Sequence, residues 1–358
     1  MPRQARLDAP GVLQHVMARG IERRKIFWDD KDRASFLERL AVILEETQTQ
    51  CYAWTMIPNH FHLLLRTGPT PLSKVMRRLM TGYAVTFNHR HRRAGHLFQN
   101  RYKSVVCEED PYLLELIRYI HLNPLRAKIV ADLKALDKYP WSGHSAILGR
   151  RKNPLILPIT KDSNKVSDEV NSKSEIRNPK SEISLAHKTT MDVLKHFGKN
   201  LKEARRRYRV FVEKGIKHGQ REDLQGGGLI RSSGGDRGSL IGQKKEDREK
   251  SDQRILGSGD FVSGVLKNAN ENAERKANYN ISLAELIHRV CNKLDIKTSE
   301  LMLDIRRPPY NQARAIISYF SIHELDCKGS DVAKALNVSR ASVSKAMSPQ
   351  DLTTKVSH

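Results

Sequence analysis

The chain has 358 residues, of which 39% are hydrophobic, and it carries a formal net charge of +23 with a pI near 9.9. This length allows two or three domains, and the positive charge indicates a polyanionic partner such as nucleic acid. The sequence has no apolar run of membrane-spanning length, no apolar N-terminal segment typical of a secretory signal and no Cys-x-x-Cys pair among its four cysteines. We therefore expect a cytoplasmic protein without membrane contact, zinc finger or disulfide framework.

In chain order, the apolar pattern first predicts strands alternating with helices. Residues 13–19 have a strand pattern, and the helix predicted next runs to about residue 46 with Asp32 as its cap. A strand pair follows at 51–65, then a helix at 72–88, a late strand at 105–107, and a helix opened by Asp110-Pro111. This alternation predicts an α+β fold with an antiparallel sheet and helices on one face.

The second strand of the 51–65 pair follows the turn residues Pro58-Asn59 and carries His60 and His62. Side chains alternate faces along a strand, so both imidazoles should lie on the same face, about 7 Å apart. Two imidazoles placed in this way can share a divalent metal. The alternative is a pair of polar residues on a solvent-exposed face of the sheet.

The helix opened by Asp110-Pro111 carries Tyr119 and Asn123, which are four residues apart and share a helix face. Pro124 disfavours the helical conformation at Asn123, so the helix should end or kink there. By itself Tyr119 could be a core tyrosine whose hydroxyl is bonded to a neighbour.

Residues 66–103 are unusual because they contain nine basic side chains and neither Asp nor Glu. The nine are Arg66, Lys74, Arg77, Arg78, Arg90, Arg92, Arg93, Arg101 and Lys103. A solvated helix face normally mixes both signs of charge, so we interpret this stretch as a phosphate-binding wall beside the histidine pair. The alternative is a basic surface that serves solubility.

Three motifs in order resemble one family. They are Pro-Asn-His-Phe-His-Leu-Leu at 58–64, Gly-His-Leu-Phe-Gln-Asn-Arg-Tyr-Lys-Ser at 95–104 and Arg-Tyr-Ile-His-Leu-Asn-Pro-Leu-Arg-Ala at 118–127. Together they resemble the single-tyrosine HUH transposases, in particular the REP-associated tyrosine transposases. The resemblance covers about residues 10–148, and it implies a ferredoxin-like or RRM-like sheet.

The resemblance also implies a chemistry and a set of site residues. Tyr119 would attack a phosphate of single-stranded hairpin DNA, form a 5′-phosphotyrosine link and release a 3′-hydroxyl. His60 and His62 would hold Mg²⁺ or Mn²⁺, with Asn123 as third ligand. Tyr112, seven residues before Tyr119, is the second candidate for the nucleophile. The basic residues expected to contact this DNA are Arg77, Arg78, Arg90, Arg92, Arg93, Arg101 and Lys103.

After residue 150 the composition changes several times. We expect a catalytic domain at 1–150, a disordered linker or insertion at 151–186, a basic helical middle region at 187–262 and a second linker at 263–280. Residues 281–350 read as an all-helical domain with a helix-turn-helix, in which Ser330 and Ser339 are the expected N-caps.

This last domain resembles the DNA-binding domain of the bacterial chromosomal replication initiator, and we expect it to bind duplex DNA. The geometry of a recognition helix would turn four polar side chains to the major groove: Arg340, Ser342, Ser344 and Lys345. Three arginines outside that helix would bind phosphate: Arg306, Arg307 and Arg314. The alternative is a small helical domain that binds protein.

Three functions remain open at this stage. The chain could be an active single-strand DNA endonuclease and transposase, a DNA-binding regulator that keeps the fold without turnover, or a binder of structured RNA. Tyr119, His60 and His62 together favour the first, because a pure binding protein needs none of them. A homodimer also remains open.

Overall fold

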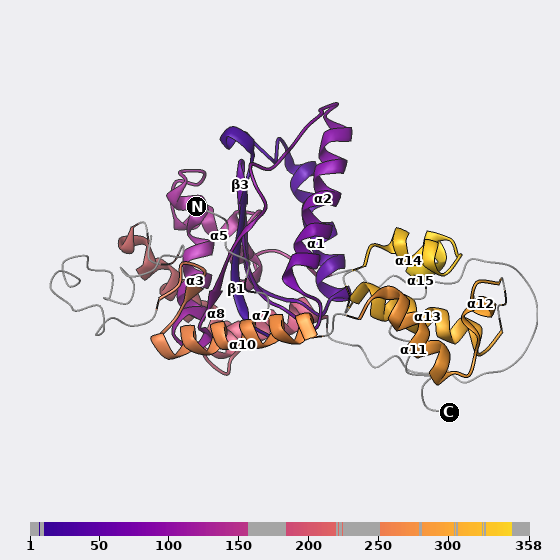
Figure 1. Ribbon diagram of the computed structural model, residues 1–358. Helices are drawn as coiled ribbons and strands as arrows, with labels where there is room; N and C mark the ends of the chain where they lie inside the picture. Colours follow the sequence, from indigo (N-terminus) through magenta and orange to yellow (C-terminus); the bar gives the residue numbers. More distant parts are fainter. Residues whose placement is uncertain are drawn as a thin grey trace, which may run out of the picture. The chain divides into compact units, whose positions relative to one another are not determined.

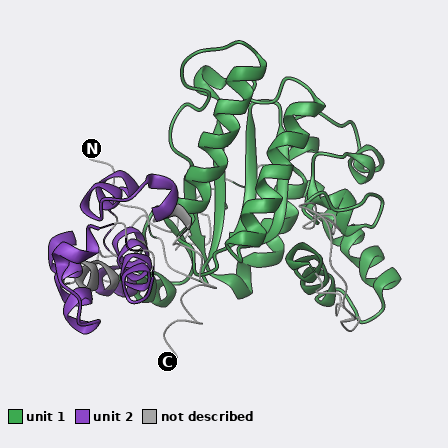
Figure 2. Ribbon diagram, turned by 90° about the vertical axis from the view of Figure 1, so that its right-hand side faces the viewer, with its two compact units in different colours: residues 1–266 green, residues 267–358 purple. Residues whose placement is uncertain are grey.

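The computed structural model describes residues 7, 11–156, 184–219, 221, 224, 251–278, 281–303, 305, 307–323, 325 and 327–345. The chain divides into two compact units, residues 1–266 and 267–358 (Figure 2). Among the described residues, no helix combines the length and apolar character needed to cross a bilayer.

The first unit is built on a five-stranded sheet with the order β2-β3-β1-β4-β5. The strands are β1 (Leu13–Arg19), β2 (Gln50–Ile57), β3 (His60–Arg66), β4 (Lys103–Cys107) and β5 (Ile255–Leu256). The first four pair antiparallel, and β5 pairs parallel to β4.

Helices α1 (Asp30–Glu46) and α2 (Leu72–Arg90) are followed after β4 by α3 (Glu109–His121), α4 (Asn123–Arg126), α5 (Leu133–Lys138), α6 (Gly143–Ile147), α7 (Leu185–Lys195) and α8 (Leu201–Lys214). Two short 3-10 turns, η1 (Ile21–Arg23) and η2 (Gly215–His218), complete these elements. The α+β class is confirmed.

Helices cover both faces of this sheet, whereas the sequence predicted cover on one face only. In β3 the successive residues Leu63, Leu64 and Leu65 are all fully buried, which requires packing on both sides. Leu63 and Leu65 lie in a core with residues of α1 and α2, and Leu64 lies in a second core with residues of α3, α7 and α8. Figure 1 shows α1 and α2 on one side of the strands and α3 and α8 on the other. The one-face prediction was wrong because α3, although predicted as a helix, packs together with α7 and α8 on the face opposite to α1 and α2.

Two helix starts differ from the prediction by two or three residues. The N-cap of α1 is Asp29, whose carboxylate accepts the backbone N–H of Asp32 at 3.0 Å. Asp32 lies inside the first turn, and its own carboxylate accepts the backbone N–H of Trp28 at 2.8 Å. Helix α3 already begins at Glu109, so Asp110 lies in its first turn.

The predicted kink before Pro124 is confirmed, because α3 ends at His121 and α4 begins at Asn123. Proline has no N–H, so the carbonyl of Ile120, four residues earlier, loses its helical partner. The side-chain amide of Asn123 donates to that carbonyl at 3.3 Å and to the carbonyl of Tyr119 at 3.2 Å. The side chain of Asn123 therefore replaces the missing backbone donor and stabilises the end of the helix that carries Tyr119.

The second unit is helical in its described residues. After α10 (Gly259–Asn278), which begins in the first unit, come α11 (Leu283–Lys293), α12 (Thr298–Leu301), α13 (Tyr310–His323), α14 (Gly329–Ala335) and α15 (Arg340–Lys345). Ser339 accepts the backbone N–H of Ser342 and caps α15 as predicted. Ser330 is not a cap, because α14 starts at Gly329 with Lys328 as its N-cap.

A buried polar chain ties α8 to α3, α5 and α6. The hydroxyl of Tyr208 lies 2.7 Å from Nδ1 of His121 and 3.1 Å from Nδ1 of His144. Nε2 of His144 donates to Asp137 at 3.0 Å, and Arg209 donates to the same carboxylate at 2.7 Å. Burial lowers the pKa of His144, so its ring is neutral and Nδ1 accepts the Tyr208 proton. Tyr208 in turn accepts from His121, and every link has one donor and one acceptor.

Replacing Tyr208 by Phe should destabilise the first unit by about 1–3 kcal/mol, because two buried imidazole nitrogens then lose their partner. Tryptophan fluorescence during urea unfolding measures this directly, since all three tryptophans lie in residues 1–266. The control is Arg207→Ala, which removes an exposed ion pair with Glu203 on the same helix and should cost at most about 0.5 kcal/mol. Equal stability of Tyr208→Phe and the unmodified chain would show that the polar chain does not anchor α8.

Candidate active site

The pairing of β1 with β3 sets the positions of the histidines. Met17 lies opposite His62, and Arg19 lies opposite His60. The strand alternation puts these side chains on the face that α3 covers, since Leu64 of the same face belongs to the core with α3. The histidine face is therefore covered, and His62 is only 5% exposed, which excludes the solvent-exposed alternative for that residue.

A pocket of about 730 Å³ opens at this end of the sheet, beside α3 and α4. It is lined by Met17, Ala18, Arg19, Ile57, His60, His62, Gln99, Asn100, Arg101, Lys103, Tyr119, Asn123, Arg126 and Ala127. The pocket thus brings together the two histidines, the tyrosine and the asparagine that the sequence singled out. It also contains four basic side chains: Arg19, Arg101, Lys103 and Arg126.

Asn59 fixes the ring of His60. The amide nitrogen of Asn59 donates to the carbonyl of Arg23 at 3.2 Å, so its oxygen is the atom that faces His60. Nδ1 of His60 lies 2.7 Å from that oxygen and is therefore the protonated nitrogen. This leaves Nε2 of His60 with its lone pair, which is the form that binds a metal.

His15 holds His62 in a similar way. Nε2 of His15 lies 2.9 Å from Nδ1 of His62, and the two rings stack with centroids 5.2 Å apart. His15 is fully buried and comes from β1, at the same face of the sheet. Sequence analysis missed this residue, because nothing local in 13–19 shows which strand lies beside it.

All three imidazoles are neutral near pH 7. Burial is the main cause that lowers the pKa of His15 to about 4 and that of His60 to about 4, with Arg19 adding to the effect on His60. Burial likewise puts the pKa of His62 well below its ordinary value. A neutral imidazole can act as a metal ligand, whereas an imidazolium cannot.

Tyr119 lies beside the histidines and is 4% exposed. Its ring centroid is 6.2 Å from that of His62 and 5.9 Å from that of His15. The guanidinium of Arg126 lies 5.1 Å from the Tyr119 ring centroid, where a positive charge favours any negative charge on the phenol. Tyr112 is not among the residues that line the pocket but packs against the core under α3.

The pocket residues fit a divalent metal with two imidazole ligands. The ring centroids of His60 and His62 are 5.1 Å apart, and both Nδ1 atoms are bonded elsewhere, which leaves the two Nε2 atoms. Asn123 lines the same pocket, and because its amide nitrogen donates to the helix, its oxygen is the atom left for a ligand. Within the described part of the chain, no three His, Cys, Asp or Glu side chains gather to hold a metal.

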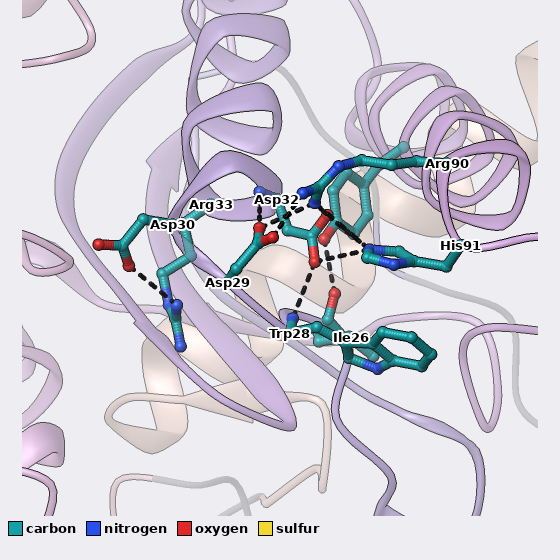
Figure 3. Close-up of polar contacts among 9 residues, drawn as sticks. Ile26, Trp28, Asp29, Asp30, Asp32, Arg33, Arg90 and His91 are labelled. Carbon is teal, nitrogen blue, oxygen red and sulfur yellow. Dashed lines mark hydrogen bonds and ion pairs between the residues drawn. The ribbon is translucent and has the colours of Figure 1, made fainter.

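The basic residues of 66–103 do not form one wall. Arg101 and Lys103 line the pocket, whereas Arg77 and Arg78 are exposed on α2, which covers the other face of the sheet, and Arg78 pairs with Glu46. Arg90 is bound by Asp29 and by the buried Asp32 (Figure 3). These two carboxylates hold the guanidinium of Arg90, whose contact with DNA stays a prediction.

Arg92 and Arg93 follow α2 in the turn after His91, and the guanidinium of Arg93 lies over the ring of Phe87. Arg19 and Arg126 line the pocket as well but were not predicted to do so. Arg19 is the last residue of β1, and Arg126 is the last residue of α4.

The basic residues predicted for the second unit have different surroundings. Arg307 is exposed, and Arg340 and Ser342 are exposed on α15. Arg314 donates to the carbonyls of Leu301, Leu303 and Ile305, so its guanidinium holds the chain after α12. Arg306 and the side chains of Ser344 and Lys345 lie outside the described residues.

Comparison with known proteins gives a family for the first part of the chain. Residues 10–123 match the family described as "Transposase IS200 like". This segment is therefore similar to that transposase family. Its matched residues include His15, His60, His62, Tyr119 and Asn123.

The chain also aligns in part with a solved structure described as "Structure of the REP associates tyrosine transposase bound to a REP hairpin". It is 15% identical, with a TM-score of 0.35, and the alignment covers 48% of this chain and 100% of that one. Comparison with curated proteins gives no match.

The buried His15 should make the first unit less stable in acid. Its pKa is about 4 when folded and about 6.5 when unfolded, so between these values the unfolded state binds the extra proton. Its contribution to the unfolding free energy, about 3 kcal/mol, is complete above pH 6.5 and is lost as the pH falls towards 4. His15→Gln should therefore flatten the pH dependence of the unfolding free energy, followed by tryptophan fluorescence in urea.

The control for this measurement is Val85→Ala, since Val85 is exposed on α2 and carries no ionisable group, so the pH dependence should stay that of the unmodified chain. The account of His15 is contradicted if the slopes of His15→Gln and the unmodified chain coincide from pH 4 to 6.5.

Proposed function

We propose that this chain is a single-strand DNA nicking and joining enzyme of the transposase type, with Tyr119 as its nucleophile. The main support for the proposal is that Tyr119, His60 and His62 line one pocket together with four basic side chains. The IS200-like match spans all of the three residues. Hairpin-containing DNA is the substrate class that the sequence resemblance implies.

In the proposed reaction the phenolic oxygen of Tyr119 attacks the scissile phosphorus. A bond forms between that oxygen and phosphorus, the bond from phosphorus to the 3′ oxygen breaks, and the phenolic proton is given up as the 3′ oxygen gains one. The products are a 5′-phosphotyrosine and a 3′-hydroxyl. One phosphate ester replaces another, so a 3′-hydroxyl can reverse the step and join strands without an external energy source.

The side chains of the pocket would assist this step through charge and position. Arg126 lies over the Tyr119 ring and would favour the developing phenolate, while Arg19, Arg101 and Lys103 would bind the phosphate. Placing positive charge in a half-enclosed pocket makes it more effective than the same charge in water.

Mg²⁺ or Mn²⁺ would be held by Nε2 of His60, Nε2 of His62 and Oδ1 of Asn123. Imidazole ligands tolerate Mn²⁺ better than Mg²⁺, which prefers oxygen. Such a metal, when bound, polarises the phosphate. His15 and Asn59 would keep the two rings turned towards it, as partners of the Nδ1 atoms do in other metal sites.

Tyr119→Phe should abolish a covalent protein–DNA adduct while leaving hairpin binding almost unchanged, since it removes one hydroxyl. The assay incubates the full chain with labelled hairpins that carry single-stranded flanks, in Mn²⁺ or Mg²⁺, and detects the adduct on a denaturing gel. The matched control is Tyr112→Phe on the same helix, which should react as the unmodified chain does.

Two results in this assay would contradict the proposal. Adduct formation that survives in Tyr119→Phe and disappears in Tyr112→Phe would move the nucleophile to Tyr112. DNA binding without any adduct, with a broad panel of hairpins, would favour the regulator that binds without turnover. EDTA or His60→Ala should also prevent the adduct, whereas His89→Ala should not.

We further propose that the second unit binds duplex DNA through α15. Helices α14 and α15 pack on the same small core, with Val332, Leu336 and Val343 buried, and Ser339 caps α15. Arg340 and Ser342 are exposed on α15, where a recognition helix would present them.

Arg340→Ala in the full chain should weaken binding to a specific duplex about tenfold, the size of one base-reading contact of roughly 1–3 kcal/mol. The duplex is selected from a random pool with the unmodified chain, and affinity is measured by fluorescence anisotropy at fixed salt. Arg289→Ala is the control, because Arg289 is exposed on α11 and pairs with Glu285. If no duplex is enriched, or if Arg340→Ala binds it unchanged, the recognition-helix assignment is wrong.

A further inference from the structure

Trp28 stands out on the surface of the first unit. It is 51% exposed, whereas Trp54 of the same unit is buried. A single exposed hydrophobic residue is common and by itself needs no explanation. Trp28 differs because neighbouring rings pack against it and because the chain segments next to it carry exposed basic residues.

The backbone of Trp28 is held by a polar network around the buried Asp32, and two neighbouring rings pack against its indole (Figure 3). The backbone N–H of Trp28 donates to Asp32 at 2.8 Å, and Asp32, itself 2% exposed, also binds Arg90 and His91. The centroid of the Trp28 ring lies 4.2 Å from that of His91 and 5.5 Å, edge-on, from that of Phe87. A ring fixed in this way loses little conformational freedom when something stacks on it.

The loop that ends at Trp28 is basic. Arg23, Arg24 and Lys25 are all exposed, and their acidic neighbour Glu22 pairs with Arg24 at 2.7 Å. On the other side of the indole, His91 is followed by Arg92, which is exposed as well. Three carboxylates follow Trp28 in the sequence: Asp29 and Asp32 are engaged by Arg90, and Asp30 pairs with Arg33 at 3.2 Å. An exposed aromatic ring among arginines and lysines is the arrangement that binds single-stranded nucleic acid.

The same loop begins at the active-site pocket. Arg19 and His60 line the pocket, and Gly20, the next residue after Arg19, donates to the carbonyl of Asn59 at 2.9 Å. Further along, Ile21 donates to Leu97 and Ile26 donates to Pro58, so the loop runs along the turn that precedes His60. A DNA strand that leaves the pocket past Arg19 therefore meets this loop first.

We propose that Trp28 is the stacking platform for an unpaired base of the single-stranded segment that flanks the scissile phosphate, with Arg23, Arg24 and Lys25 contacting its backbone. This inference rests on the proposed function, since it places the flank beside the pocket of Tyr119. Stacking on one aromatic ring tolerates any base, so Trp28 would fix the position of the strand, and base identity would be read elsewhere.

The test uses the full chain with Tyr119→Phe, which binds without cleaving, and a DNA hairpin with and without a single-stranded flank. Trp28→Ala should weaken binding of the flanked hairpin fivefold or more and leave the bare hairpin unaffected. An abasic nucleotide at one flank position should cause the same loss in the Trp28-containing chain and no additional loss in Trp28→Ala. This non-additivity identifies the base that stacks on the indole.

Fluorescence provides a second readout. A stacked base should quench the emission of Trp28, so the flanked hairpin should quench the protein, and Trp28→Phe should remove most of that quenching. Trp141→Phe, a substitution outside the proposed platform, should retain it. Trp28→Phe keeps an aromatic ring and should bind more tightly than Trp28→Ala, which separates stacking from any loss of folding.

The inference is overturned if Trp28→Ala binds flanked hairpins as the parent chain does, or if the loss is the same with the bare hairpin. Additive effects of the abasic site and Trp28→Ala would also overturn it and would point to a protein partner at Trp28. Failure of the proposed function is distinguishable, because it appears as a missing adduct in the chain with Tyr119, whatever the binding data show.

Discussion

The packing of α3 across the sheet is the contact on which the candidate site depends. Antiparallel pairing of β1 with β3 puts His15, His60 and His62 on one face, and α3 closes over that face with Tyr119. Burial of the imidazoles lowers their pKa, so they stay neutral near pH 7. The same packing puts the ring centroid of Tyr119 6.2 Å from that of His62. Helix α8 packs against α3, and the hydroxyl of Tyr208 on α8 is hydrogen-bonded to His121 on α3. The basic middle region of the chain is therefore part of the structure that positions Tyr119.

Whether a basic side chain of this protein can bind a ligand depends on its partners as much as on its position in the sequence. Arg78 and Arg90 are paired with carboxylates, and Arg314 in the second unit is bound to backbone carbonyls, so these cations stabilise the protein itself. The basic residues in the pocket come from β1, from the 99–103 segment and from α4. A count of basic residues along the sequence therefore overstates the surface available to phosphate, and burial and pairing decide which cations can serve it.

The sequence predicted what local chemistry determines. The spacing of His60 and His62 predicted that they share a face of the sheet, and the spacing of Tyr119 and Asn123 predicted a shared helix face. Pro124 predicted the kink. It could not give His15 or Arg19, because their roles depend on which strand pairs with β1. The packing of α8 on the first unit could not be predicted from the sequence either. Only a narrow stripe of this arginine-rich helix is buried, namely Ala204, Tyr208 and Val212. Long-range pairing leaves no local signal in a single sequence.

The central claim is that the phenol of Tyr119, placed beside His60 and His62, becomes the covalent partner of DNA. The most direct measurement is peptide mapping by mass spectrometry of the chain after reaction with a hairpin oligonucleotide in Mn²⁺. The account predicts a peptide that contains Tyr119 and carries a nucleotide through a 5′-phosphate. A nucleotide linked to Tyr112 or to any other residue, or no linked peptide under conditions in which the strand is cut, would contradict it.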